Sequence, residues 1–332
     1  MNQTTSAPEH TLVPVVDSHR HLWDLHHLPW NWVRGAGLPT EDLFEESEPL
    51  PSVLVEAGVD VGYERAELEW LLDIAERNDK VLGIIAALPH GMGATQDTMS
   101  ALADTPRVAG VRHNLQELGP GELASRDVVG VIAAVHSAGL PFDVCVRAHQ
   151  LVEVTHMLRM LDTDGTLVLD HLGKPPLGQD LTRWRDDIAT LAADPRVVVK
   201  CSGLVAEMPP PYQPQRARSE PATEQSSRTV LTPEAAELCS APLRFALRNF
   251  GHERVMLGSD APVSGKGWVR PRDCIQFQIQ LLKPDLAGPA LESIASLTAQ
   301  RIYGLSEQTA TATSATATNA ESAPHSNHQN NL

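Results

Sequence analysis

Eight short apolar runs, rich in β-branched residues, alternate along this chain with longer segments of helical periodicity. The runs are Val13–Val16, Ser52–Glu56, Val81–Ala87, Val108–Arg112, Pro141–Val146, Thr166–Leu169, Arg196–Lys200 and Arg254–Leu257. Runs that are apolar on both faces are typical of strands covered on both sides, as in a parallel sheet. Eight β/α alternations without an obvious second domain therefore predict an α/β fold, a single closed (β/α)8 barrel over residues 13–305.

The segments between the runs carry apolar stripes of helical spacing. Helices are expected at 64–78, 126–138, 181–193 and 232–249. In the first of them Leu71, Leu72 and Ala75 share a stripe, while most charged residues fall elsewhere. An open, doubly wound sheet is the alternative architecture. It is less favoured because no glycine-rich phosphate loop follows the first run.

Three segments lack these patterns. Residues 1–12 and 306–332 are polar and of low complexity, and are expected to be a disordered leader and tail. A proline-rich insertion at 206–231 interrupts the barrel near its carboxyl-terminal end. It is either a mobile lid over the active site or a disordered insertion.

Composition excludes several classes of function. The net charge of −16, without a basic block, argues against nucleic-acid binding. No apolar stretch approaches the roughly 20 residues that cross a bilayer, so no membrane partner is expected. The four cysteines are widely spaced and form no CxxC pair, which favours reduced, buried thiols and a cytoplasmic location.

Polar and titratable residues follow the apolar runs. In chain order they are His19 and His21, Glu56, Arg112, Cys145 and Arg147, Asp170 and His171, Lys174, Lys200, Ser202 and Asp260. Because the carboxyl ends of barrel strands share one face, we expect these groups at one mouth. Paired imidazoles can hold a metal or donate hydrogen bonds to a polarised carbonyl. Taken singly, each histidine could be structural and Asp260 could be a helix cap.

The motifs that carry these residues occur in a fixed order. They are Asp-Ser-His-Arg-His-Leu-Trp-Asp at 17–24, Val-Ala-Gly-Val-Arg-His-Asn-Leu-Gln at 108–116, Leu-Asp-His-Leu-Gly-Lys-Pro at 169–175, Lys-Cys-Ser-Gly-Leu at 200–204, Arg-Val-Met-Leu-Gly-Ser-Asp-Ala-Pro-Val at 254–263 and Arg-Ile-Tyr-Gly-Leu at 301–305. As a set they resemble the amidohydrolase-2 branch of the amidohydrolase superfamily. Within it, the likeness is to lactonases of the L-fuconolactonase, L-rhamnonolactonase and 2-pyrone-4,6-dicarboxylate types. The resemblance implies hydrolysis of a small cyclic ester.

The resemblance also implies roles for individual residues. His19 and His21 match the family's first-strand His-x-His pair. His171 matches the histidine after the sixth strand, and Asp260 the aspartate after the eighth. Arg112 matches an arginine that contacts the substrate in related lactonases. Further candidate substrate contacts are Trp23, Arg147 and Lys174.

The chain departs from the family pattern in two places. Where binuclear members carry a metal-bridging lysine or glutamate and a fifth-strand histidine, this chain has Cys145-Val146-Arg147, which disfavours a two-metal site. The usual Gly-Ser-Asp-Trp-Pro reads Gly-Ser-Asp-Ala-Pro at 258–262, so an aromatic wall is missing beside the aspartate.

These residues define an expected mechanism. Asp260 would act as general base towards water, and His19, His21 and His171 would stabilise the carbonyl oxygen, directly or through one divalent metal. A single zinc is expected, with Asp260 and Glu56 as further candidate ligands, although related lactonases include metal-free types. The alternatives are a metal-dependent decarboxylase or amide hydrolase on the same barrel, and a non-catalytic binding barrel. The expected partner is a small lactone, and a homo-oligomer stays open.

Overall fold

Eight parallel strands form a barrel in the computed structural model, which describes residues 13–44, 50–88, 95–212, 232–264, 269–286 and 288–305. The strands are β1 (Asp17–Arg20), β4 (Ser52–Val55), β5 (Val81–Ala87), β6 (Val108–Asn114), β7 (Phe142–Cys145), β8 (Leu167–Leu169), β9 (Val197–Cys201) and β10 (Val255–Leu257). Each pairs with the next in this order. The main chain at Arg20 and Ala261 closes the ring between β1 and the segment after β10. The (β/α)8 prediction is confirmed.

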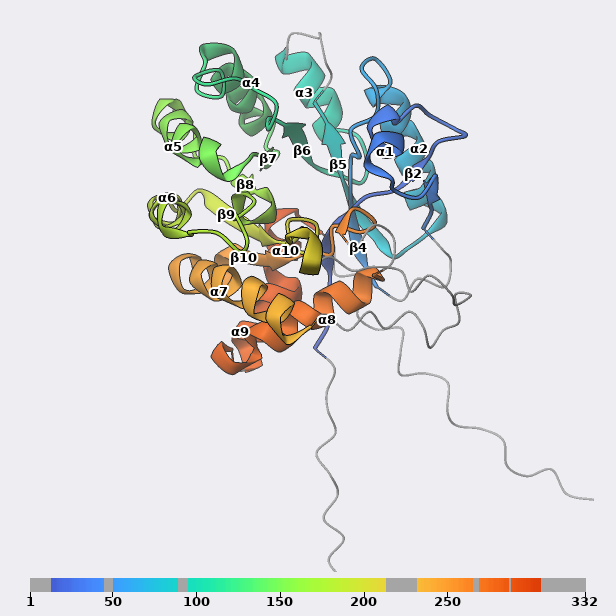
Figure 1. Cartoon of the computed structure of the whole chain (residues 1–332). Coiled ribbons are helices and arrows are strands. Elements are labelled where there is room, and N and C mark those ends of the chain that lie inside the picture. Colours follow the sequence, from blue (N-terminus) through green and yellow to red (C-terminus); the bar gives the residue numbers. More distant parts are fainter. Residues whose placement is uncertain are drawn as a thin grey trace, which may run out of the picture.

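Helices surround the strands and follow one another around the barrel in chain order (Figure 1). They are α2 (Glu64–Arg77), α3 (Gln96–Ala103), α4 (Arg126–Ser137), α5 (Leu151–Met160), α6 (Thr182–Ala192), α7 (Pro233–Phe250) and α8 (Pro271–Leu282). The short helices α9 (Gly288–Glu292) and α10 (Thr298–Ile302) flank a π-helical turn, Ser293–Leu297. Before α2, the chain forms the pair β2 (Trp23–Asp24) and β3 (Glu41–Asp42) around α1 (Asn31–Ala36).

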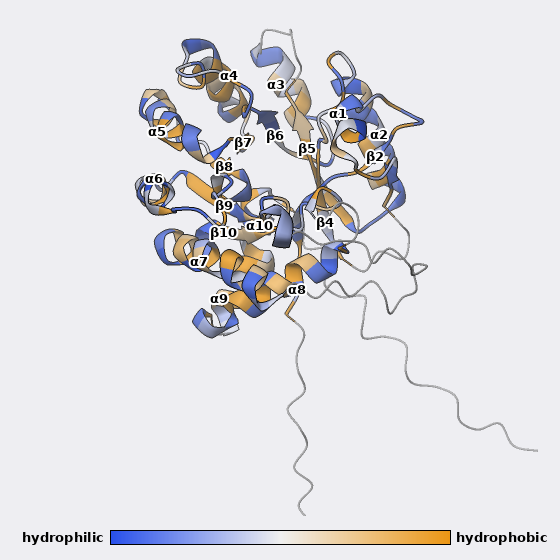
Figure 2. Cartoon of the chain, viewed as in Figure 1, coloured by the Kyte–Doolittle hydropathy of each residue, from blue (hydrophilic) through white to orange (hydrophobic). Residues whose placement is uncertain are grey.

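The apolar stripes predict where the helices lie, and capping side chains mark where several of them begin. All four expected helices are present, with their ends within a residue of prediction. The side chains of Thr95, Ser125 and Thr232 cap α3, α4 and α7 by accepting a hydrogen bond from a first-turn amide. Apolar residues gather on the strands and on the helix faces that meet them, while polar residues lie mainly outside (Figure 2). The barrel is therefore held by one extended layer of apolar packing between strands and helices.

The first strand was predicted one segment too early. The apolar run 13–16 is not in the sheet, and β1 consists of the polar residues Asp17–Arg20. Burial of Asp17 is possible because its carboxylate has partners: it accepts hydrogen bonds from the Ser259 amide at 2.8 Å and hydroxyl at 2.5 Å. The Val16 amide instead donates to the Ala295 carbonyl, at the foot of the barrel.

The carboxyl-terminal residues fill the floor of the barrel. Tyr303 and Leu305 pack with a second cluster that draws residues from most of the strands, including Val53, Val168 and Met256. The fit is tight: a Cβ added to Gly83 would lie 2.9 Å from a Leu305 methyl group. This closes the amino-terminal end of the barrel and leaves the opposite end for chemistry.

The described residues account for the barrel but not for every predicted segment. The leader at 1–12, the tail at 306–332 and the part of the insertion from 213 to 231 lie outside the described residues. The start of the insertion, 206–212, is described and contains a 3-10 turn at Pro210–Tyr212. All four cysteines are buried thiols without a disulfide partner. Among the described helices, none combines the length and apolarity that a membrane span requires.

Candidate active site

A cavity of about 470 Å³ opens at the carboxyl ends of the barrel strands. Its lining consists of His21, Trp32, Ala57, Gly58, Arg112, Asn114, Gln116, Glu117, Cys145, His171, Lys174, Gly203, Ala206, Glu207, Asp260 and Val263. Most of these residues belong to the loops and strand ends that the sequence predicted to converge. Barrel enzymes carry their chemistry at this face.

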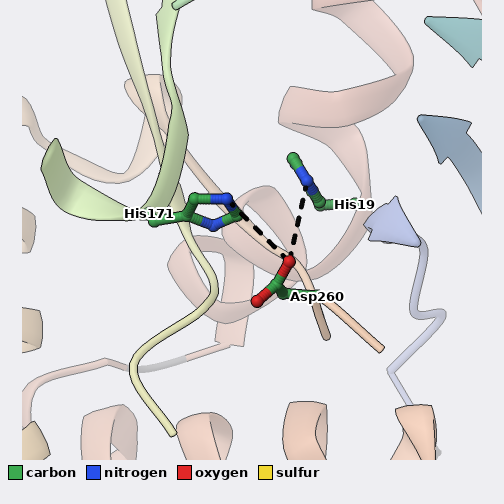
Figure 3. A group of neighbouring side chains, drawn as sticks. All are labelled: His19, His171 and Asp260. Atoms are coloured by element: carbon green, nitrogen blue, oxygen red, sulfur yellow. Dashed lines mark ion pairs between the residues drawn. The ribbon is translucent and has the colours of Figure 1, made fainter. Parts of the chain in front are cut away.

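Three imidazoles surround one carboxylate oxygen at the base of this cavity. Asp260 Oδ1 lies 3.5 Å from His21 Nε2 and 3.9 Å from both His19 Nε2 and His171 Nε2. The rings of His19 and His171 flank the carboxylate (Figure 3). All four side chains are buried. The structure thus brings together the four groups that the sequence predicted to meet. His19 lies on β1, and His21, His171 and Asp260 lie in the segments that follow β1, β8 and β10.

Their spacing fits one divalent metal. His19, His171 and Asp260 offer ligand atoms within 4.8 Å of one another, and His21 Nε2 lies 3.1 Å from His19 Nε2. Ligand atoms at about 2.0–2.2 Å around a tetrahedral ion are roughly 3.3–3.5 Å apart. Small shifts of these side chains would therefore complete a three- or four-ligand site.

Two alternative tautomers of His19 are compatible with the contacts around its ring. His21 Nδ1 lies 3.0 Å from the Val55 carbonyl, which can only accept, so the lone pair of His21 is on Nε2. If Lys200 Nζ donates to His19 Nδ1 at 3.1 Å, then His19 Nε2–H can donate to His21. If instead His19 Nδ1–H donates to Asp170 Oδ1 at 3.3 Å, both Nε2 lone pairs face the same point, as a metal requires. The buried Asp170 Oδ1 has no hydrogen bond otherwise.

Left-handed backbone positions aim His171 and Asp260. Residues 171–174 have φ between 53° and 63°, and Asp260 has φ of 56°. Such a conformation costs about 1–2 kcal/mol for each residue other than glycine. The Trp184 indole offsets part of this cost by donating to the Leu172 carbonyl at 2.8 Å. Gly203 leaves space for the imidazole, because a Cβ there would lie 2.7 Å from His171 Nδ1.

Charges in the site are set by burial and by close neighbours. Burial alone would raise the pKa of Asp260, but the adjacent His171, His21 and His19 hold it below its usual value. Burial lowers the pKa of His171 to about 4 and that of His19 well below its usual value. At neutral pH Asp260 is therefore an ionised carboxylate beside the neutral imidazoles of His19 and His171, as proton acceptance or metal binding requires.

A buried ionic network lies directly below the imidazoles. Lys200 Nζ donates to Asp143 Oδ2 at 2.5 Å and lies 3.5 Å from Asp170 Oδ1. The Tyr303 hydroxyl donates to Asp143 at 2.9–3.0 Å, and Arg112 Nε to Asp170 at 2.9 Å. The sequence assigned no role to Asp143 or Tyr303 and placed Lys200 at the mouth of the barrel, whereas Lys200 is fully buried. The available signal was a charged residue inside each of two apolar strands, which is rare without a partner.

The remaining predicted residues divide into two groups. Arg112 and Lys174 line the cavity, but both are paired: Arg112 with Glu56 and Asp170, Lys174 with Gln116 at 2.8 Å and Glu207 at 3.7 Å. The Glu56 carboxylate pairs with Arg112 and accepts a hydrogen bond from the Gly58 amide at 2.6 Å. These contacts hold it apart from the three imidazoles.

The other two candidate substrate contacts, Trp23 and Arg147, do not line the cavity. Trp23 is fully buried, and its indole donates to the Pro39 carbonyl at 2.9 Å. The Arg147 side chain is about half exposed and pairs with Glu117 at 3.0 Å. Both positions follow a strand, but the backbone there directs the side chains into packing or to the surface.

The raised pKa of the buried Glu67 predicts that the stability of the protein depends on pH. Burial, and then the nearby Glu56, raise the pKa of Glu67 to about 8, while its Oε1 accepts hydrogen bonds from Trp30 and Ala57. The unfolded chain loses this proton near pH 4.5, so stability falls as pH rises towards 8. We expect the free energy of unfolding to drop by about 2 kcal/mol between pH 6.5 and 8, and Glu67→Gln to remove that drop.

The measurement is urea denaturation at both pH values. Glu69→Gln is the matched control, because Glu69 lies on the same helix but is exposed and pairs with Arg65. An equal pH dependence in the wild type and in Glu67→Gln would show that Glu67 is ionised in the folded state.

Comparison with known proteins agrees with this geometry. A family model described as Amidohydrolase matches residues 16–305. An L-fucono-1,5-lactonase of Burkholderia multivorans is 28% identical over 265 residues, covering 75% of this chain and 82% of that protein. A second, of Burkholderia ambifaria, is 25% identical over 259 residues, covering 75% and 80%. A crystal structure of a Burkholderia multivorans amidohydrolase with bound zinc superposes with a TM-score of 0.70 at 25% identity, covering 88% of this chain and 100% of that one. The match spans the barrel from its first strand to its last helix, and the chain belongs to the amidohydrolase family of hydrolytic enzymes.

Proposed function

We propose that this protein hydrolyses a small lactone, with a sugar-acid lactone as the preferred type. The observation that carries the proposal is the ionised Asp260, held within 3.5–3.9 Å of three imidazoles at the base of an open cavity. The likeness to two L-fucono-1,5-lactonases supports the choice of a cyclic ester over an amide or a carboxylate.

Asp260 is the group that accepts a proton from the attacking water. Its Oδ2 accepts a hydrogen bond from the Ser264 hydroxyl at 2.9 Å, so Oδ1 is the oxygen presented to the imidazoles and the cavity. Because the pKa of Asp260 is low, the carboxylate is ready at neutral pH and readily passes the proton on to the leaving alkoxide.

His19 and His171 can donate to the carbonyl oxygen as negative charge develops on it, and all three imidazoles can hold an ion. Ser202 fixes the ring of His171 through a 2.9 Å contact to Nδ1, and Val55 fixes the ring of His21. We propose that His19, His21, His171 and Asp260 hold a single zinc. When bound, this ion would supply positive charge beside the carbonyl oxygen and lower the pKa of water.

Metal removal tests this arrangement. Dialysis against a chelator should remove about one zinc per chain, measured by elemental analysis, and abolish turnover of the best lactone. Zinc added back should restore activity, and the thermal midpoint should fall and recover in parallel. Full activity in protein shown to be metal-free would contradict the zinc site. It would instead favour direct hydrogen bonds from the imidazoles.

A substrate screen tests the reaction itself. Proton release should accompany opening of neutral aldonolactones, followed with a pH indicator, and Asp260→Asn serves as the inactive control. Amides of matched size and aromatic carboxylates test the alternative hydrolase and decarboxylase reactions. Turnover confined to one of those classes would refute a lactonase.

A further inference from the structure

A rigid, partly exposed indole lies at the rim of the cavity. Trp32, on α1, has 40% of its surface exposed and lines the same cavity as His21 and Asp260. Its Nε1–H donates to the Ala57 carbonyl at 2.8 Å, and its ring meets Trp23 edge to face, with centroids 5.7 Å apart. The hydrogen bond and the contact with Trp23 hold the indole in place, and part of its surface lines the cavity.

Other parts of the cavity wall are polar. Asn114, Gln116, Lys174 and Glu207 contribute amide, ammonium and carboxylate groups to the lining. Lys174 already donates to Gln116 and pairs with Glu207, so these groups are held in place before any ligand arrives. An apolar platform combined with fixed donors and acceptors suits a ligand with one hydrocarbon face and hydroxyl groups around its edge.

The charges of the lining favour a neutral ligand. The cations among the described lining residues are Arg112 and Lys174, and each is paired with carboxylates. Among the described lining carboxylates, Glu207 is paired with Lys174 and Glu117 with Arg147, while Asp260 adds negative charge beside the imidazoles. A substrate with two free carboxylates would meet repulsion here without an unpaired cation to bind it.

We propose that Trp32 is a substrate-binding residue that stacks on the hydrocarbon face of a neutral, polyhydroxylated lactone ring, with Asn114, Gln116 and Glu207 binding its hydroxyl groups. This inference rests on the proposed function and adds to it the class of ring and the residue that selects it. Stacking contributes equally to ground-state and transition-state binding, since the ring face does not react. It should therefore appear in KM and not in kcat.

The kinetic test compares Trp32→Ala with Trp32→Phe on the best neutral aldonolactone. We expect Trp32→Ala to raise KM about tenfold with kcat within twofold of wild type, and Trp32→Phe to stay within about threefold in KM. Tyr63→Ala is the matched control, because Tyr63 is an exposed aromatic residue of the next segment that does not line the cavity. The KM of Tyr63→Ala should equal that of the wild-type protein.

A binding test separates this inference from the reaction. The probe is a 1,5-anhydroalditol, a cyclic ether that keeps the hydroxylated ring but has no ester to hydrolyse. In saturation-transfer NMR with the wild-type protein, the C–H protons of one ring face should receive the most saturation. Trp32→Ala should lose that pattern. The result stands even if no lactone is turned over, in which case the proposed function fails and the stacking site remains.

Three results would overturn the inference. The first is an unchanged KM in Trp32→Ala whose folding is confirmed by circular dichroism. The second is saturation spread evenly over both ring faces of the probe with the wild-type protein, which needs no variant. The third is turnover of a pyrone dicarboxylate with a kcat/KM equal to that of neutral lactones, where we expect it to be at least about a hundredfold lower.

Discussion

Asp260→Asn should lower kcat for lactone hydrolysis by about a thousandfold while leaving the fold intact. The substitution keeps the shape of the side chain and can keep the contact of Oδ2 with Ser264, but the amide cannot accept the proton of water. General-base catalysis is worth about 10²–10⁴ in rate. The measurement is kcat at saturating substrate, with circular dichroism and thermal melting as checks on folding.

Ser264→Ala gives a graded comparison. It removes one hydrogen bond to the same carboxylate, so the orientation of Asp260 loosens without loss of its charge. We expect kcat to decrease about tenfold, far less than in Asp260→Asn.

Near-normal turnover by Asp260→Asn would exclude Asp260 as the base and would contradict the proposed mechanism.

Lys200→Met should destabilise the protein by about 3–5 kcal/mol at neutral pH. Lys200 is fully buried, and its ammonium group is the cation shared by Asp143 and Asp170. Methionine keeps most of the side-chain volume but removes the positive charge. The two buried carboxylates then lie near each other without the ammonium group between them. The free energy of unfolding, from urea denaturation at pH 7, measures the loss.

A double variant tests the physical reason. Burial already raises the pKa of Asp143 to about 6, so this carboxylate is easily neutralised. Lys200→Met combined with Asp143→Asn should recover much of the lost stability, because the unpaired charge is gone while the Tyr303 hydroxyl keeps an acceptor. A loss below about 1 kcal/mol in Lys200→Met alone would show that the network is not what stabilises the core.

Local patterns were sufficient to predict the barrel. Apolar periodicity depends on neighbours three or four residues away, so helices such as α2 and α4 were predicted to within a residue. The convergence of His19, His171 and Asp260 also followed, because strand ends share one face in a barrel.

Partners distant in sequence set the limit of prediction. Asp17 is in a strand because Ser259, 242 positions away, satisfies its carboxylate. Lys200 is buried because Asp143 on β7 and Asp170, which directly follows β8, lie beside its ammonium group. The sequence shows these residues but not their partners, so the first strand was misplaced and the ionic network was missed.

The Tyr303 hydroxyl donates to Asp143, which holds Lys200 beside His19, so a residue near the carboxyl end supports the first strand of the candidate site. During synthesis on a ribosome, His19 and Asp143 emerge before Tyr303, so the Asp143 carboxylate at first lacks this hydrogen-bond partner. The hydrogen bond from Tyr303 to Asp143 can form only after position 303 has left the exit tunnel, so this part of the network is completed late in synthesis.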